Sequence, residues 1–387
     1  MFVDVDDYLR PHLEALMRDG APDQLFDAHT HIGANDPDGM KQSPAELLAG
    51  LRAAQARGVV FPMHEPDGYP PANDAVLAAV EASGGRLVAF CRVDPRADAV
   101  SEARRCMDAG ARGIKLHPRA ETFALSEPVV RELVALAHDR SAPVLVHAGR
   151  GIPALGRDTV ELSAEFPRAR LILAHGAISD LAWLWAELRA HPNVFVDTSW
   201  WHPSDLLALF ALAPPGQILW ASDSPYGDPL FAAIIGLRCA RQAGLTPAQL
   251  TAVMGGQLDR LLSGEEPLDV GPAPGVIGPG LHPLLERVVV HATGALQRQL
   301  AQADPTEPLE LARLACAVGE QGPHAVLMSE VLELLDAFDR LVQPPVEGRM
   351  FPDALRLVVI ALVLARTPDV GLPERPDAPR PVRAEID

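Results

Sequence analysis

The chain has 387 residues, of which 48% are hydrophobic, so it can bury a large core and is not disordered throughout. Its formal net charge of −18, from 51 acidic and 33 basic side chains, argues against a nucleic-acid partner. The N-terminus lacks the layout of a signal peptide, and the apolar run 355–366 is too short to span a bilayer. Four scattered cysteines form neither a zinc-binding pair nor a disulfide framework. We therefore expect a cytoplasmic, reduced protein without a membrane partner.

Short apolar runs alternate with helix-length stretches between residues 24 and 263. The helix-length stretches carry apolar residues at three-and-four spacing, as at 43–58, 126–140 and 180–191. Eight runs are typical of β-strands, at 24–31, 58–64, 86–93, 113–118, 143–149, 170–177, 193–199 and 217–223. Because strands separated by helices pair in parallel, this order predicts an α/β protein with a closed (β/α)8 TIM barrel. An open doubly wound sheet is the alternative, but the Gly-rich loop that usually follows its first strand is missing.

The composition changes after the barrel. We assign residues 1–263 to the barrel, and the Gly- and Pro-rich stretch 264–281 is predicted to be a linker. Residues 282–366 predict a small all-α domain, with helices at 282–302, 307–319, 324–342 and 351–366. The Pro-rich, charged residues 367–387 are expected to be disordered. The helical domain can pack on the barrel, drive formation of a homodimer or cover the mouth of the barrel, and the sequence does not choose among these.

Polar residues end several of the predicted strands. His29 and His31 lie two apart at the end of the first strand and therefore share a face. Corresponding positions hold Lys115 and His117 on the fourth strand, His147 on the fifth, His175 on the sixth and Asp223 on the eighth. In a (β/α)8 barrel these strand ends meet at one mouth, where active sites lie. Imidazole nitrogen and carboxylate oxygen suit zinc, so the joint pattern predicts a metal site, although His-x-His alone is a weak signal.

The chain from about residue 24 to 263 resembles the amidohydrolase superfamily, in the branch of aminocarboxymuconate semialdehyde decarboxylase and related lactonases and hydrolases. The stretches that carry the resemblance are DAHTHIG, GIKLHP, VLVHAG, LILAHGA, VFVDTS and WASDSPYG, with the closing helix LTAVMGGQLDRLL. The resemblance implies a distorted barrel that usually binds one divalent metal, here through His29, His31, His147 and Asp223. It also implies that His175 hydrogen-bonds the metal's water or the substrate. We expect zinc, with manganese as the alternative.

This ligand set supports hydrolysis of an amide, ester or lactone of a small molecule. Asp223 would act as general base and His175 would stabilise the developing oxyanion or return the proton to the leaving group. The same residues also support non-oxidative decarboxylation of a small carboxylic acid, and the ligands alone do not separate the two reactions. By analogy with the small hydrolases of the branch, we favour hydrolysis. A non-catalytic barrel that serves as a scaffold is the remaining alternative.

Lys115 has three interpretations. In some relatives with two metals, a lysine on the fourth strand is carboxylated and bridges the metals, a role that we do not favour here. Lys115 can instead pair with an acid such as Asp27, or contact the substrate together with His117. Further substrate contacts are expected from His64, Arg150 and Tyr226 at other strand ends, whereas Trp200 and Trp201 are expected to cover apolar surface.

Overall fold

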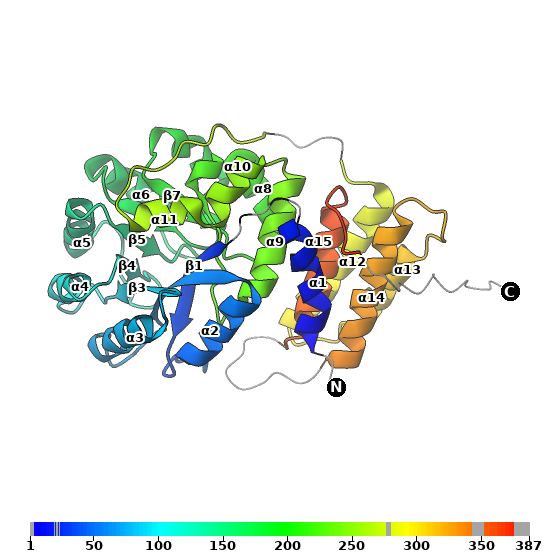
Figure 1. The fold of residues 1–387 in the computed structure, drawn as a ribbon, viewed down its shortest axis with the longest axis horizontal. Helices are drawn as coiled ribbons and strands as arrows, with labels where there is room; N and C mark the ends of the chain where they lie inside the picture. Colours follow the sequence, from blue (N-terminus) through cyan, green and yellow to red (C-terminus); the bar gives the residue numbers. More distant parts are fainter. Residues whose placement is uncertain are drawn as a thin grey trace.

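The computed structural model describes residues 4–18, 20, 22, 24–275, 280–342 and 352–374. Eight parallel strands form one sheet in chain order, wrapped by helices (Figure 1). The strands are β1 (Leu25–Ile32), β2 (Ala56–Pro62), β3 (Leu87–Arg92), β4 (Gly113–Leu116), β5 (Pro143–Val146), β6 (Arg170–Leu173), β7 (Val194–Asp197) and β8 (Ile218–Leu219). The first and last strands meet, because Ala28 N donates to Trp220 O (3.0 Å) and Asp223 N donates to His29 O (2.8 Å). The predicted (β/α)8 barrel is confirmed.

Helices connect the strands on the outside of the barrel. They are α2 (Pro44–Ala53), α3 (Pro70–Ala82), α4 (Ala99–Asp108), α5 (Pro128–Asp139), α6 (Leu155–Glu165), α7 (Leu181–Glu187), α8 (Pro203–Leu212), α9 (Pro229–Gln242), α10 (Pro247–Thr251) and α11 (Gln257–Leu262). A capping box of Ser43 and Glu46 starts α2. The helix predicted over 43–58 is too long, because Gln55 has a φ of 56° and turns the chain into β2 at once.

The interior of the barrel is apolar at its centre and polar at the carboxyl ends of the strands. Phe90, Leu145 and Phe195 belong to the buried central cluster. Two residues further along the same strands, on the same face, come Arg92, His147 and Asp197. Gly113 belongs to the central layer as well, because a Cβ atom there would lie 2.7 Å from the Phe90 ring. The alternation of side chains therefore brings the polar residues to one end of the barrel.

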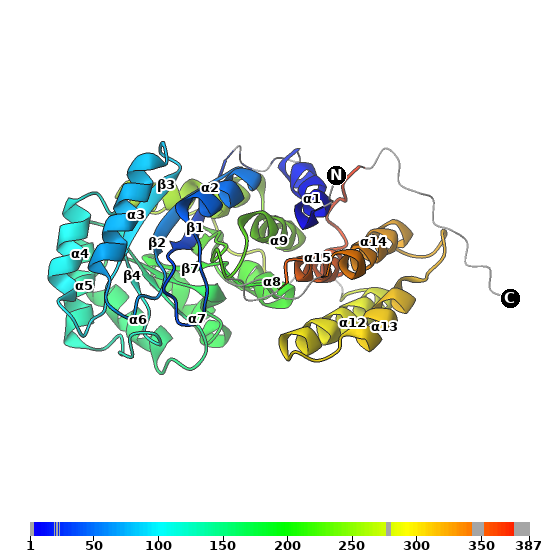
Figure 2. The same ribbon diagram turned by 90° about the horizontal axis from the view of Figure 1, so that it is seen from below.

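The C-terminal helices form a separate layer beside the barrel (Figures 1 and 2). They are α12 (Pro283–Leu300), α13 (Thr306–Cys316), α14 (Ala325–Leu341) and α15 (Leu355–Arg366). The helix α15 contacts α12 and α14 on one side and α8 and α9 of the barrel on the other. Its central position explains why the run 355–366 is apolar on nearly all faces. The N-terminal helix α1 (Val5–Arg18), which we place with the barrel from its sequence, contacts both α9 and α15.

The segment that follows α15 is held by one buried arginine. Arg238 of α9 is 1% exposed, and its guanidinium donates to Thr367 Oγ1 (2.8 Å), Thr367 O (2.9 Å), Val370 O (3.0 Å) and Gly371 O (2.9 Å). These bonds explain why residues 367–374 are ordered, in contrast to the disorder expected over 367–387. Residues 375–387 lie outside the described residues, as do residues 276–279 of the predicted linker.

We expect Arg238→Ala to lower the free energy of unfolding by about 3 kcal/mol or more, since it leaves several buried carbonyl groups without a donor and opens a cavity. Urea denaturation of the full chain measures this loss. The matched control is Arg189→Ala, because Arg189 is exposed on the barrel surface, and it should change stability by less than about 0.5 kcal/mol. Equal effects of the two substitutions would show that Arg238 does not anchor the segment.

Two further sequence predictions concern the described part of the chain. All four cysteines are buried and none forms a disulfide. Among the helices described, none combines the length and the apolar character that crossing a bilayer requires.

Candidate metal centre

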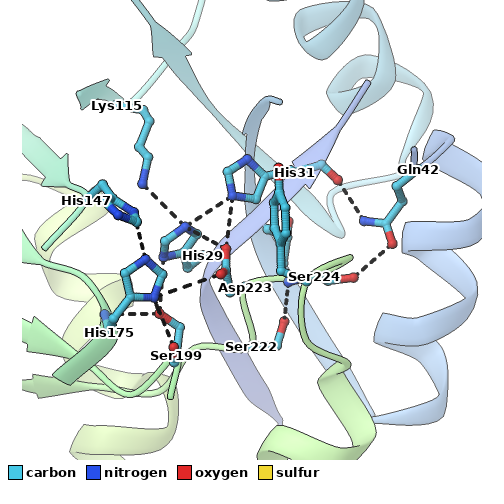
Figure 3. Close-up of polar contacts among 12 residues, drawn as sticks. His29, His31, Gln42, Lys115, His147, His175, Ser199, Ser222, Asp223 and Ser224 are labelled. Atoms are coloured by element: carbon cyan, nitrogen blue, oxygen red, sulfur yellow. Dashed lines mark hydrogen bonds and ion pairs between the residues drawn. The ribbon is translucent and has the colours of Figure 1, made fainter. Parts of the chain in front are cut away.

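Three side chains converge at the carboxyl end of the barrel (Figure 3). His29 Nε2 and His31 Nε2 lie 3.2 Å apart, and each lies 3.1 Å from Asp223 Oδ1. The exposed fraction of the side chain is 1% for His29, 4% for His31 and 18% for Asp223, so the cluster opens to solvent beside Asp223. Asp223 has a φ of 60°, in the left-handed region, which is a strained conformation often found at functional sites.

The spacing of the three atoms fits one metal ion. Two nitrogen ligands of a tetrahedral zinc, each at 2.0–2.1 Å, lie about 3.3 Å apart. The three distances between His29 Nε2, His31 Nε2 and Asp223 Oδ1 are 3.1–3.2 Å. The donor types agree as well, because two imidazoles and a carboxylate are characteristic of catalytic zinc sites.

The hydrogen bonds of both histidines direct a lone pair into the cluster. His29 Nδ1 donates to Asp197 Oδ2 (2.9 Å), and His31 Nδ1 faces the carbonyl oxygen of Pro62 (3.4 Å). Since both partners are acceptors, the proton of each neutral ring belongs on Nδ1 and Nε2 is unprotonated. Burial lowers the pKa of His31 to about 3, which keeps its ring neutral at pH 7. Two lone pairs and one carboxylate oxygen thus face one another, an arrangement that a divalent cation stabilises.

A buried aspartate close to the cluster joins the first strand of the barrel to the last one. Asp27 Oδ1 accepts from His29 N (3.0 Å) and from Ser222 N (2.9 Å), so it joins β1 to the chain after β8. Complete burial raises the pKa of Asp27 to about 7. This carboxylate therefore positions the backbone of the ligands and is not itself part of the cluster.

Asp197 lies in the site, and the sequence analysis does not identify it. Besides His29 Nδ1, it accepts from the backbone N–H groups of His175 and Ser199 (both 2.9 Å). Burial alone would raise the pKa of Asp197, but the charges of His29 and His175 and the hydrogen bonds from the His29 ring and the Ser199 hydroxyl hold it below its ordinary value. A carboxylate that binds the second nitrogen of a ligating histidine fixes the orientation of the ring and raises its basicity. The available signal is the position of Asp197 two residues after Phe195 in an interior-facing run.

We expect Asp197→Asn to weaken zinc binding about 10- to 100-fold, since the amide no longer offers a charged acceptor to His29. Competition with a chromophoric chelator measures the affinity. Asp205→Asn is the control, because Asp205 accepts from Trp200 Nε1 and contacts no ligand. Zinc affinity that is unchanged in the Asp197 variant would contradict the orienting role.

The remaining histidines form a second group next to the cluster. His175 Nδ1 faces the carbonyl oxygen of Ser199 (3.0 Å), so it carries the proton, and His175 Nε2 accepts from His147 Nδ1 (2.9 Å). This leaves His147 Nε2 buried, unprotonated and without a hydrogen-bond partner among the described residues. Burial, followed by the influence of His175, lowers the pKa of His147 far below its ordinary value. His147 lies outside the group of ligand atoms within 4.8 Å of one another, but its Nε2 is chemically ready to bind a cation.

Lys115 lies against His29 of the candidate metal centre. Its side chain is 1% exposed, with Nζ 3.3 Å from His29 Nε2 and 4.9 Å from the centre of the Phe61 ring. The interpretation that Lys115 pairs with Asp27 is wrong, and no carboxylate in the described part of the chain is within ion-pair distance of it. Burial lowers the pKa of Lys115 to about 7.

The other residues predicted to contact substrate lie in three different places. The His117 ring stacks on His147, with centroids 3.8 Å apart, and the Tyr226 ring lies edge-on to His31 at 5.5 Å. The Tyr226 hydroxyl donates to Asp36 Oδ2 (2.5 Å). His64 instead lines a separate cavity around Tyr69, and Arg150 is exposed.

A buried ion pair at the end of β3 is a further feature that the sequence analysis misses. Arg92 Nη2 donates to Glu121 Oε1 (2.7 Å), and the Tyr69 hydroxyl donates to the same oxygen. Arg92 lies beside Lys115 in the register of β3 and β4. The pair therefore places a second cation in the polar end of the barrel, already neutralised by its own carboxylate.

Comparisons with known proteins agree with this architecture. A family model described as Amidohydrolase matches residues 26–256. Similar solved structures include an uncharacterized TIM-barrel protein from Bordetella bronchiseptica (15% identity, TM-score 0.50) and 5-carboxyvanillate decarboxylase from Sphingomonas paucimobilis (14%, 0.50), each aligned over 62% of this chain and 99% of its own. A 2,6-dihydroxybenzoate decarboxylase complexed with 2,6-dihydroxybenzoate matches at 15% identity and TM-score 0.50, over 63% of this chain and 99% of its own. No curated protein matches. At these identities the structures share the fold alone.

Proposed function

The chain belongs to the amidohydrolase superfamily, in its metal-dependent TIM-barrel branch, and on that premise we propose that it is a metal-dependent hydrolase of a small-molecule amide, ester or lactone. The observation that carries the proposal is the cluster of His29 Nε2, His31 Nε2 and Asp223 Oδ1 at mutual distances of 3.1–3.2 Å. A divalent ion at these atoms would lower the pKa of a bound water and polarise a carbonyl group. We expect one zinc ion, with manganese as the alternative and His147 as a further ligand.

The residues around the cluster supply the proton transfers that hydrolysis needs. Burial would raise the pKa of Asp223, but His29 and the hydrogen bonds from both histidines hold it well below its ordinary range. Asp223 is therefore an anion, and its second oxygen lies 3.9 Å from His175 Nδ1 and can accept a proton. We assign the general-base role to Asp223. In this proposal the Nδ1–H of His175, which faces Ser199 O in the structure, would turn to stabilise the oxyanion or the leaving group.

Decarboxylation of a small carboxylic acid is the second candidate. Lys115 supports it, because a buried amine without a carboxylate partner can bind the carboxylate of a substrate. Two of the similar structures described above are decarboxylases of aromatic acids. A non-catalytic scaffold has less support, since the described residues retain the complete cluster.

The test is a purified, zinc-loaded protein supplied in parallel with ester, lactone, amide and aromatic-acid panels. We expect hydrolysis of at least one ester or lactone, lost after chelation and restored by zinc. Release of carbon dioxide from an aromatic acid, without hydrolysis of any panel member, would replace the hydrolase proposal by the decarboxylase. The cytoplasmic location and a homodimer stay predictions from the sequence.

A further inference from the structure

A cavity of about 140 Å³ lies where the C-terminal helices meet the loop after β8, and we call it the apolar pocket. The barrel contributes Trp201, Tyr226 and Phe231 to its lining, and the helices α12 and α15 contribute Leu296, Leu300 and Val359. An apolar cavity of about 150 Å³ accommodates one benzene molecule. The apolar pocket therefore has room for one aromatic ring or one short branched chain.

The apolar pocket adjoins the metal centre through the loop that carries Asp223. Tyr226 follows Asp223 by three residues, packs edge-on against His31 and also lines the pocket. Of the three side chains of the cluster, Asp223 is the most exposed, at 18%, and it belongs to this loop. Trp201 closes the pocket from the loop after β7, which carries Ser199 of the same site. Tyr226 and the loop that carries Asp223 therefore join the apolar pocket to the surroundings of the cluster.

The edge of the pocket carries charged side chains of both signs. Arg356 lines the pocket, but its Nη1 is 2.9 Å from Asp6 Oδ1 and 3.2 Å from Asp228 Oδ1. Asp228 lines the pocket as well, so this guanidinium is already neutralised by carboxylates. An uncharged apolar group matches the leucine, valine and aromatic side chains of the wall.

We propose that the apolar pocket binds a neutral aromatic or branched aliphatic part of the substrate, so that the C-terminal helical domain determines the specificity of the barrel's metal centre. The inference rests on the proposed function for the reaction, but the pocket itself is a feature of this chain's own helices. It assigns a substrate class, namely esters, lactones or amides that carry a compact apolar group next to the scissile bond.

The first test compares benzyl acetate with methyl acetate, whose leaving groups have similar basicity. We expect the wild type to prefer benzyl acetate in kcat/KM, and Leu300→Trp, which fills the pocket, to lower that preference about tenfold or more. Leu311→Trp is the matched control, because Leu311 is 38% exposed on α13 and Leu300 is 39% exposed on α12. Of these two leucines, Leu300 lines the apolar pocket and Leu311 does not, so the control should keep the preference of the wild type.

The second test needs no turnover. Benzyl alcohol is titrated into the metal-free protein and its binding is followed by saturation-transfer NMR. We expect Leu300→Trp to weaken binding at least fivefold and Leu311→Trp to leave it unchanged. Trp201→Ala, which enlarges the pocket, should extend binding to naphthalenemethanol and serves as the readout if Leu300→Trp fails to fold by thermal melting.

The two proposals fail in different ways. Specific binding of benzyl alcohol without hydrolysis of any ester would overturn the proposed function and support the apolar pocket. Ester hydrolysis with equal preference and equal binding in the wild type, Leu300→Trp and Trp201→Ala proteins would overturn the pocket and leave the hydrolase proposal in place.

Discussion

Asp223→Asn should lower kcat by about 10³-fold, the largest loss that we expect from one substitution at this site. Asp223 Oδ1 lies 3.1 Å from both ligating nitrogens, and its second oxygen is the proposed proton acceptor. The amide has the same shape but carries no charge, so it weakens metal binding and cannot take up a proton. Steady-state kinetics on the best substrate of the panels, together with elemental analysis of the variant, measures both losses.

The control for this substitution is Asp158→Asn on α6, which removes one carboxylate that does not belong to the cluster. It should retain full metal content and activity close to that of the wild type. If the Asp223 variant kept its metal and turned over within tenfold of the wild type, Asp223 would be neither an essential ligand nor the base.

The sequence predicts part of the ligand cluster from alternation along a strand. His29 and His31 share a face by their spacing, and Asp223 continues the interior positions of Leu219 and Ala221. Alternation from Phe26 and Ala28 alone would turn Thr30 inward, and a register shift between Asp27 and Thr30 brings the histidine face of β1 into the barrel instead. Alternation alone does not place His175 in the barrel interior. The predicted strand 170–177 stops at Leu173, and alternation from Ile172 would turn His175 away from the barrel interior. A φ of 57° at His175 turns the residue back, and no sequence pattern specifies such a backbone angle.

Asp197 and Arg92 could not be assigned from the sequence for a different reason. Each is a charged residue at an interior position of a strand, and its role depends on a partner distant in the chain. Asp197 binds His29 across the barrel, and Arg92 binds Glu121 from the loop after β4. Residue type and spacing within one strand carry no information about such partners, which the closed fold alone brings together.

In the helical domain, too, local sequence patterns predict the helices but not how they pack. The periodicity predicts α12 to α15 within a few residues of their bounds, because each helix has one apolar face or, for α15, apolar residues on nearly every face. Whether those faces pack on the barrel or form a dimer depends on surfaces far apart in the sequence. The structure shows that α15 packs on α8 and α9, with α1 against both α9 and α15. The loop after β8 and the helices then enclose the apolar pocket, which no local pattern indicates.

Zinc should stabilise the chelated protein in proportion to its affinity, since an ion that binds only the folded state adds about 4 kcal/mol at 1,000 times its dissociation constant. Thermal melting before and after addition of zinc measures the change as an upward shift of the midpoint. His31→Ala should abolish the shift, because it removes one of the three atoms that face one another at 3.1–3.2 Å. An equal shift in His31→Ala would place the binding site elsewhere.

The stoichiometry of the same binding decides the role of Lys115. We expect one equivalent of zinc in the wild type and in Lys115→Met, a substitution that keeps the buried volume but removes the amine. With its pKa near 7, Lys115 is in part uncharged at neutral pH, so a cation held by His29 at this distance need not be repelled. Two equivalents in the wild type, reduced in Lys115→Met, would instead mean that a carboxylated Lys115 bridges two ions. In that case the unpartnered Nε2 of His147 would belong to the second ion.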